Sequence, residues 1–266
     1  MNKTELIRPL AQNDEDRLLL AQVLDKLETC RERSYMTHTR FLDLRQRTLV
    51  TRLIERAGAR GEAVLWGGYP DAERVCALFY PDYMTAEDAC DPENAPFSLL
   101  RAEKSPSDTL SHRDYLGALM GLGLDRSVVG DILVHDGGAE ILVMDDMAEY
   151  IEANFFKAGR KHISLSLAPL SALIVPEVQE IVREGSVASM RLDSVTALIF
   201  NLSRTQSQEF IEKGLVFVNH MQVLKNEYPL HPGDRITLRG HGRARIEELG
   251  GVSRKGRQFL RYARSQ

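Results

Sequence analysis

The sequence predicts an α+β protein built from three parts. The first 95 residues combine helical hydrophobic patterns with two short strand patterns, and residues 96–184 follow the order β-α-β-β-α-β. Residues 185–266 begin with two short helical patterns, continue with strands and are rich in basic residues. We therefore expect a mostly helical N-terminal α+β domain (1–95), a ferredoxin-like middle domain (96–184) and a basic C-terminal module with its tail (185–266).

Length and composition are those of a soluble globular protein of two or three domains: 266 residues, 43% hydrophobic and 27% charged. No apolar run approaches the roughly 20 residues that span a bilayer, and the first residues are too polar for a secretory signal. The three cysteines lack Cys-x-x-Cys spacing, and the seven histidines lack metal-ligand spacing. We expect a cytoplasmic protein without a cofactor, metal or membrane segment.

The N-terminal part shows helical stripes separated by strand patterns. Its helical stripes run from Leu6 to Thr29 and from Phe41 to Ile54, and Gly58 closes the second. Two strands and a linker follow, at Ala63–Trp66, Val75–Tyr80 and Asp91–Pro96.

The middle part predicts a sheet with two crossing helices. Strands are expected at 97–104, 131–134, 139–144 and 163–167, and helices at 112–121 and 145–158. Asp136-Gly137-Gly138 is a strong hairpin signal between the second and third strands. RNA-recognition domains share this topology, but the strand Glu140–Asp145 lacks the aromatic residues that they use to stack bases. The topology alone therefore does not predict RNA binding by this domain.

The C-terminal part predicts a short connecting helix over 176–182 and then two helices. Ser189 is expected to cap the first, Arg191–Leu202, and Ser203 the second, which ends at Gly214. Strands follow around Val216–Val218 and Ile236–Leu238, with Gly233-Asp234 as the turn before the second. The tail after Arg245 either contacts RNA or packs as a last strand.

The charge is distributed unevenly along the chain. From Ser186 onward there are 13 Lys and Arg against 7 Asp and Glu, whereas the preceding 185 residues hold 21 against 31. The net charge of -4 hides this asymmetry, which predicts a polyanion-binding C-terminal module.

The order of motifs in this module resembles a known RNA-binding fold. Arg191-Leu192-Asp193 opens one helix and Ser203-Arg204 the next, and Leu215–Asn219, Gly233-Asp234 and Leu238-Arg239-Gly240 follow. This resembles the S-four-type (αL) fold of the small ribosomal subunit. In that fold the helix starts and the adjoining strand hairpin form one positive surface that holds structured RNA.

The resemblance implies a set of RNA-binding residues. Arg191 and Arg204 would converge on one RNA backbone, because each guanidinium can bind two phosphate oxygens. Asp193 is expected to pair locally with an arginine or to cap backbone. The predicted RNA-binding set is Arg191, Ser203, Arg204, Lys213, Asn219, Lys225, Arg239, Arg243, Arg245 and Lys255.

Beyond the module, the whole chain resembles the YlmH family of bacterial RNA-binding proteins. The resemblance is carried by Thr39–Asp43, Gly67-Gly68-Tyr69 with Ala72-Glu73-Arg74, His112–Leu119, Gly130-Asp131-Ile132 and Arg239–Arg243. His241 departs from the aromatic residue that the family often carries at this position.

The family resemblance implies a non-enzymatic factor in ribosome-associated quality control. The implied partners are ribosomal RNA of the large subunit and a peptidyl-tRNA, which the factor would hold while an alanine tail is added to the stalled chain. DNA and membranes are not expected partners, and a monomer is expected. A protein-interaction adaptor in cell division and an accessory factor in RNA modification are the alternatives.

Enzymatic alternatives find little support in the sequence. Pseudouridine synthases use an Arg-Leu-Asp aspartate in a large domain after the module, whereas here that tripeptide opens the module itself. No nucleotide-binding motif of a tyrosyl-tRNA synthetase or P-loop is present. His112-Arg113-Asp114 lacks the other kinase motifs, and Ser111 with Asp114 predicts a helix cap. His112 and Arg113 remain as a secondary RNA or partner contact.

Overall fold

The computed structural model describes residues 2–177 and 180–265. The chain forms two compact units, Met1–Pro176 (unit 1) and Glu177–Gln266 (unit 2), and each unit has its own hydrophobic core residues. The predicted α+β class is confirmed. Among the described residues, no helix is long and apolar enough to cross a membrane.

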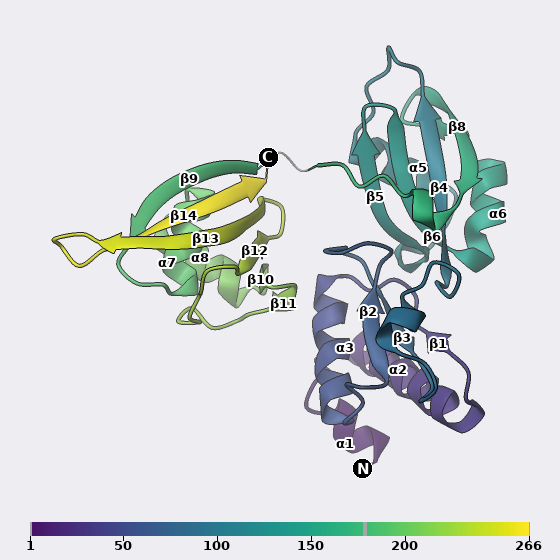
Figure 1. Ribbon diagram of the computed structural model, residues 1–266, viewed down its shortest axis with the longest axis horizontal. Helices are drawn as coiled ribbons and strands as arrows, with labels where there is room; N and C mark the ends of the chain where they lie inside the picture. Colours follow the sequence, from purple (N-terminus) through teal and green to yellow (C-terminus); the bar gives the residue numbers. More distant parts are fainter. Residues whose placement is uncertain (1, 178–179, 266) are drawn as a thin grey trace. The chain divides into compact units, whose positions relative to one another are not determined.

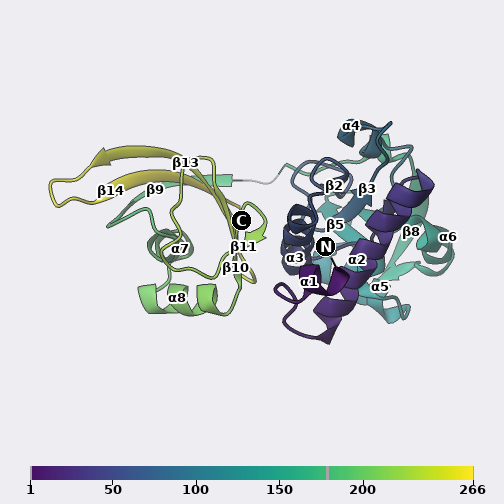
Figure 2. The same ribbon diagram turned by 90° about the horizontal axis from the view of Figure 1, so that it is seen from below.

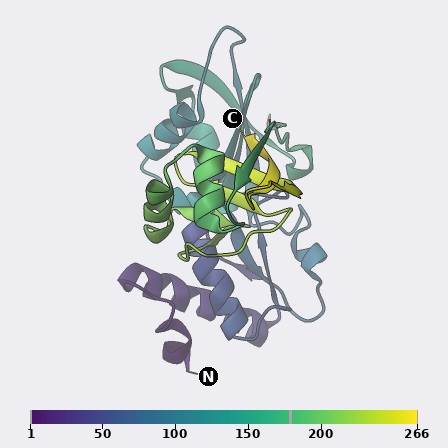
Figure 3. The ribbon, with the colours of Figure 1, turned by 90° about the vertical axis from the view of Figure 1, so that its left-hand side faces the viewer.

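The first part of unit 1 packs helices against a small sheet. Its helices are α1 (Lys3–Ile7), α2 (Asp14–Arg33), α3 (Leu44–Arg56) and α4 (Ala86–Ala89). Its antiparallel sheet has the order β1-β3-β2, with β1 (Thr37–His38), β2 (Ala63–Trp66) and β3 (Cys76–Phe79). Apolar residues of α2, α3 and β3 form the core of this part, which lies at one end of unit 1 in Figures 1 and 3.

The second part of unit 1 has the predicted ferredoxin-like topology. Its elements are β4 (Phe97–Lys104), α5 (His112–Gly121), β5 (Val129–His135), β6 (Gly138–Met144), α6 (Asp145–Asn154), β7 (Lys157–Ala158) and β8 (Lys161–Ala168), with short 3-10 turns at Arg126–Val128 and Leu170–Ala172. The antiparallel sheet has the order β5-β6-β4-β8-β7. Alternate apolar residues of β4 and β6 pack against α5 and α6.

The helix predicted over 145–158 ends earlier, at Asn154. Phe155 leaves the helical conformation and is buried in the core, so the chain turns inward there. Lys157 and Ala158 then pair with His162 and Lys161. Tertiary burial of Phe155 therefore overrides the helical pattern of the sequence.

Residues of the family motifs join the two parts of unit 1. The Asp131 carboxylate accepts hydrogen bonds from Tyr69 Oη at 2.7 Å and from the backbone N–H groups of Glu73 and Arg74 at 2.8 and 3.1 Å. A Cβ at Gly130 would lie 2.7 Å from the Phe41 ring, so only glycine allows this approach. Residues 1–95 thus share core and hydrogen bonds with the ferredoxin-like part, in place of the separate domain expected from the sequence.

Unit 2 packs two helices on one face of a six-stranded antiparallel sheet (Figure 2). Its elements are β9 (Glu180–Val187), α7 (Leu192–Phe200), α8 (Arg204–Glu212), β10 (Val216–Val218), β11 (Met221–Gln222), β12 (Arg235–Leu238), β13 (Gly242–Val252) and β14 (Gln258–Ser265). The strand order is β11-β10-β12-β13-β14-β9.

The connecting helix predicted over 176–182 is wrong in its described part. Residues 178 and 179 lie outside the described residues, and Glu180–Val187 is strand β9, paired along its whole length with β14. The division between units therefore falls after Pro176, earlier than the boundary at 184/185 expected from the sequence. The C-terminal tail packs as a strand, β14, which was one of the two alternatives that the sequence left open.

The helix signals of unit 2 are mostly confirmed. Ser203 caps α8 by accepting from the backbone N–H of Gln206, and Gly214 has the left-handed conformation (φ +70°) after it. The N-cap of α7, however, is Arg191 rather than Ser189, and α7 ends at Phe200 before Asn201. Backbone acceptors from another segment replace the expected serine at this cap.

Candidate nucleic-acid interface

The start of α7 is held by the loop that precedes β12. The backbone N–H groups of Leu192 and Asp193 donate to the carbonyl oxygens of Tyr228 (2.9 Å) and Asn226 (3.1 Å). The first N–H groups of a helix have no partner within the helix, so these carbonyls satisfy them. This arrangement sets the position of Arg191 at the beginning of α7.

A single buried carboxylate brings Arg191 and Arg204 together. Asp193, whose side chain is 0% exposed, accepts from Nε and Nη2 of Arg191 at 3.2 Å and from Nε and Nη2 of Arg204 at 3.1 Å. Gln208 Nε2 donates to the same carboxylate at 3.0 Å. The predicted convergence of the two arginines is thus organised by Asp193, which pairs locally as the sequence suggested.

The environment of Asp193 favours its ionised form. Burial acts to raise its pKa, but the hydrogen bonds from Gln208, Arg191 and Arg204 outweigh burial and lower the pKa below its ordinary value. Asp193 therefore stays charged at neutral pH and keeps both guanidinium groups in place.

The two guanidinium groups remain accessible from outside. The Arg191 side chain is 34% exposed and the Arg204 side chain 56%. Asp193 binds their Nε and Nη2 groups, and no contact among the described residues engages either Nη1. The Nη1 N–H groups of these partly exposed side chains can bind an anion such as a phosphate oxygen.

Glu227 already occupies part of this surface. Its carboxylate accepts from Arg191 Nη2 at 2.8 Å, and its side chain is 68% exposed. An exposed ion pair of this kind contributes only about 0–1 kcal/mol, so a phosphate can replace the carboxylate. Neither Glu227 nor Gln208 was predicted from the sequence, because neither lies in the motifs that mark the fold.

Three of the other predicted residues lie on separate parts of unit 2. Lys213 follows α8 and pairs with Glu209 at 3.4 Å, while Lys225 is exposed in the loop after β11. The Asn219 side chain donates to Asp234 (2.8 Å) and accepts from the backbone N–H of Arg235 (2.9 Å). Asn219 therefore holds the turn after β10, and its amide is occupied by this structural role.

The predicted arginines on strand β13 do not lie on the same surface as Arg191 and Arg204 at the starts of α7 and α8. On β13, Ala244 and Ile246 face α7 and α8 in the core, so Arg243 and Arg245 lie on the opposite face of the sheet. Arg245 Nη2 also pairs with Glu180 at 3.2 Å and with Glu247 at 3.6 Å. The single groove expected from the sequence is thus divided by the sheet, and Arg239 lies beyond the end of β12.

The remaining predicted residues lie at two exposed sites. Lys255 is in the turn between β13 and β14. His112 and Arg113 are exposed at the start of α5 in unit 1, where Ser111 donates to the Asp114 carboxylate from its backbone N–H (2.8 Å) and its hydroxyl (2.6 Å). The capping role predicted for Ser111 and Asp114 is therefore present.

The face of the ferredoxin-like sheet opposite α5 and α6 carries an ion pair in place of stacking aromatics. Glu140 on β6 is fully buried and accepts from Arg101 Nε at 2.7 Å, and His135 Nε2 lies 3.4 Å from the same carboxylate. Because the charges of Arg101 and Glu140 are paired, this position offers neither an aromatic ring for stacking nor a net positive charge to RNA. The helix starts of unit 2 are consequently the better candidate for an RNA contact.

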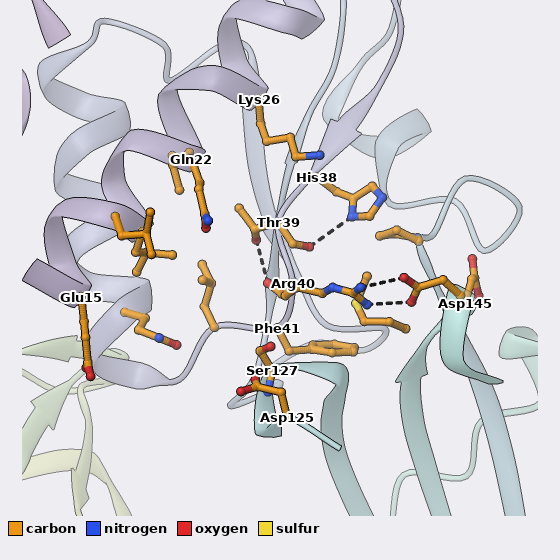
Figure 4. A pocket seen from close by; sticks show the side chains of 18 residues that line it. Glu15, Gln22, Lys26, His38, Thr39, Arg40, Phe41, Asp125, Ser127 and Asp145 are labelled. Atoms are coloured by element: carbon orange, nitrogen blue, oxygen red, sulfur yellow. Dashed lines mark hydrogen bonds and ion pairs between the residues drawn. The ribbon is translucent and has the colours of Figure 1, made fainter. Parts of the chain in front are cut away.

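Unit 1 also contains an open cleft of about 960 Å³ between α2, the segment after β1 and the start of α6 (Figure 4). Arg40 spans it and pairs with Asp146, with both N–O distances at 2.6 Å. His38 lines it as well, and burial lowers the pKa of this imidazole. Among the described residues no cluster of His, Cys, Asp or Glu could hold a metal ion.

Comparisons with known proteins agree with this architecture. Residues 103–172 match the RNA-binding domain family of YlmH, and residues 190–236 match the S4 domain family. The "Ribosome-associated protein quality control protein P2" of Bacillus subtilis (strain 168) is 33% identical over 252 residues, which cover 95% of this chain and 96% of that protein.

A solved structure titled "Cell division protein ylmH from Streptococcus pneumoniae" is also similar. It is 26% identical, with a TM-score of 0.48, over 62% of this chain and 97% of that chain. Identity above 30% along nearly the full length of the Bacillus relative, together with both domain matches, establishes the family. The chain belongs to the YlmH family, with an S-four-type domain at its C-terminal side.

Proposed function

We propose that this protein binds the large ribosomal subunit through contacts with ribosomal RNA and tRNA. In this proposal it acts in the cytoplasm, without catalysing a reaction, in the quality control of stalled nascent chains. It holds a peptidyl-tRNA on the subunit while an alanine tail is added. The name of the Bacillus relative, which places that protein in ribosome-associated quality control, supports the proposal.

The observation that carries the proposal is the arginine pair held by Asp193. Two guanidinium groups from different helices are fixed by one buried carboxylate while their side chains remain 34% and 56% exposed. Fixed forks of this kind bind phosphate oxygens at a lower entropic cost than flexible lysines. Because phosphates are the same along every RNA, these contacts position the protein, and the subunit's shape supplies the selectivity.

Sucrose-gradient co-sedimentation with ribosomal subunits tests the proposal. We expect the wild type to sediment with the large subunit and Arg191→Ala/Arg204→Ala to stay at the top of the gradient. A matched control is Arg17→Ala/Arg60→Ala, which removes the same charge from two exposed ion pairs of unit 1. This control should sediment as the wild type does.

Salt dependence separates phosphate contacts from other causes. The affinity of the wild type for the large subunit should fall as the salt concentration rises. In a plot of the logarithm of the association constant against the logarithm of the salt concentration, the slope for Arg191→Ala/Arg204→Ala should be less steep by about 2, or about one for each lost phosphate contact. If this variant still co-sediments at physiological salt, the surface is assigned wrongly. If the wild type does not sediment with ribosomes, an adaptor role in cell division becomes the better explanation.

A further inference from the structure

The β13–β14 hairpin extends beyond the core of unit 2. On β13, Ala244 and Ile246 are buried, whereas residues 248–252 are all exposed. Figures 1 and 2 show the hairpin projecting past α7 and α8. The S4 domain match ends at residue 236, so the hairpin lies outside the part that this chain shares with that family. The core alone therefore does not explain why the hairpin is so long.

The projecting part carries an exposed aromatic ring. Phe259 on β14 is 46% exposed and faces away from α7 and α8, since its neighbour Leu260 is buried in the core. On the paired strand, a Cβ at Gly250 would lie 3.1 Å from Phe259 Cβ, and Gly251 follows. On the β13 side the two glycines leave the space beside the ring free of side chains, whereas on the β9 side Ser186 pairs with Phe259. A planar group can therefore reach the ring from the β13 side.

The tip of the hairpin is positively charged and has no acidic residue. Residues 249–266 contain five Lys and Arg and no Asp or Glu. Arg257 Nε is tied to Ser186 Oγ at 3.0 Å, and Arg261 pairs with Glu247 and Glu248. Arg254 and Lys255 are exposed in the turn, with no ion pair to any described residue. Both charges are therefore available to an outside anion at the turn.

We propose that the hairpin tip is a second RNA contact, in which an unpaired base stacks on Phe259 and the adjoining phosphates bind Arg254 and Lys255. The inference rests on the proposed RNA-binding function and adds a preference for unpaired nucleotides. An exposed aromatic ring beside cations is the combination with which proteins bind single-stranded RNA.

The dimensions and charge of the tip favour RNA over a protein or a lipid surface. Phe259 presents one ring on its face of the hairpin, beside Gly250, whereas the exposed Leu249 and Val252 pair with Leu260 and Gln258 and lie on the opposite face. One ring matches one planar base, whereas a protein interface usually buries several apolar side chains in a continuous patch. Charge complementarity is with a polyanion, since Arg254, Lys255 and Arg257 surround the turn without an acid. A base with its own phosphates supplies both the planar face and the negative charge.

Fluorescence anisotropy with the full-length protein and two RNA probes tests the inference. One probe is a blunt RNA hairpin, and the other is the same hairpin with a short single-stranded overhang. We expect the wild type to bind the overhang probe about tenfold more tightly than the blunt probe, because one base stacks on the protein. Phe259→Ala should abolish this preference, and Phe259→Tyr should retain it.

Two further variants test the parts of the contact. Arg254→Ala/Lys255→Ala should weaken binding of the overhang probe and lower its salt dependence. Leu224→Ala removes an equally exposed apolar side chain (48%) from another loop of unit 2 and should leave both probes unchanged. Circular dichroism and melting temperature should show that each variant is folded.

The outcomes separate this inference from the proposed function. If Phe259→Ala binds both probes as the wild type does, while Arg191→Ala/Arg204→Ala weakens both, the hairpin contact is refuted and the helix-start surface stands. If Phe259→Ala weakens both probes equally, stacking of an unpaired base is refuted. If the wild type binds neither probe nor ribosomes, the proposed function itself fails.

Discussion

At the scale of single residues, Asp193 organises the candidate RNA-binding surface. Its carboxylate holds Arg191, Arg204 and Gln208, and its backbone carbonyl accepts from Ser207 Oγ at 2.9 Å. One side chain thus links the start of α7 to α8 and also orients two cations. Asp193 therefore contributes both to the stability of unit 2 and to the candidate RNA-binding surface. Glu227, by contrast, contacts only the exposed side of Arg191.

Replacement of Asp193 should lower stability in a pH-dependent way. We expect Asp193→Asn to cost about 2 kcal/mol of unfolding free energy at pH 7, because hydrogen bonds to a charged acceptor are weakened. The pKa of Asp193 is lowered in the folded state, so its contribution is complete above the unfolded value of about 3.9. It is lost as the pH falls below that value toward the folded pKa.

Urea unfolding of the wild type and Asp193→Asn at pH 7 and pH 3 measures this effect. The difference in unfolding free energy between the two proteins should narrow at pH 3. An equal difference at both pH values would mean that the negative charge of Asp193 is not what stabilises unit 2.

Removal of the competing carboxylate at Glu227 should strengthen RNA binding. We expect Glu227→Gln to raise RNA affinity about threefold at low salt, because a phosphate then no longer has to displace the Glu227 carboxylate from Arg191. Glu55→Gln is a matched control, since Glu55 is in an exposed ion pair with Arg60 in unit 1. Titration by fluorescence anisotropy measures the RNA affinity of both variants. An equal gain in affinity for both would mean that the change in net charge, and not the displacement of Glu227 from Arg191, strengthens binding.

At the scale of elements, strand β5 depends on a close approach to Phe41. A Cβ at Gly130 would lie 2.7 and 2.8 Å from two atoms of the Phe41 ring, and this ring packs against Phe97 with centroids 5.1 Å apart. The ring therefore cannot move aside without disturbing the core that joins the two parts of unit 1.

We expect Gly130→Ala to destabilise the protein by about 1–3 kcal/mol, the usual cost of overpacking. Gly117→Ala on α5 is the matched control, because an added Cβ there meets no atom within 4 Å and alanine is a better helix former. Thermal unfolding should show a lower melting temperature for Gly130→Ala only. Equal shifts for both variants would contradict the explanation from close packing.

The hairpin β13–β14 shows how one element can serve two purposes. Its base contributes Ala244, Ile246, Leu260 and Tyr262 to the core, and its tip presents Phe259 and two cations to solvent. The β9 strand pairs with β14 along its length, and Arg257 binds Ser186 on β9. The tip is thus held in place although it lies beyond the helices.

At the scale of the whole molecule, the two units differ in charge and have separate cores. Unit 1 carries 20 basic and 28 acidic residues, and unit 2 carries 14 and 10. The excess of positive charge in unit 2 is smaller than in the segment that begins at Ser186, because residues 177–185 add Glu177, Glu180 and Glu184 but only one basic residue, Arg183. In the proposed function, RNA binding therefore depends on where the cations lie within unit 2 more than on its net charge.

Because no core cluster of the described residues includes both units, we expect two unfolding transitions. Calorimetry of Asp193→Asn should shift only the transition of unit 2, and Gly130→Ala only that of unit 1. A single transition that moves in both variants would show that the units unfold cooperatively.

Local features of the chain were predicted well because their causes act over a few residues. Ser203 as an N-cap, the left-handed Gly214 and the hairpin at Asp136-Gly137-Gly138 follow from side chains and backbone preferences within one turn. The ferredoxin-like order of strands also followed from alternation and spacing. Long-range pairing was harder, and the first residues of strand β9, 180–182, were predicted to be helical.

The sequence by itself determined the α+β class, the S-four-type order of elements and the two arginines at the helix starts. Only the tertiary structure decided that Asp193 would hold both of them, that Glu227 would compete for Arg191, and that Arg243 and Arg245 would lie on the other face of the sheet. Capping and alternation depend on neighbours in sequence. A buried charge, by contrast, is satisfied by whichever residues the fold brings near, and these can lie far away along the chain.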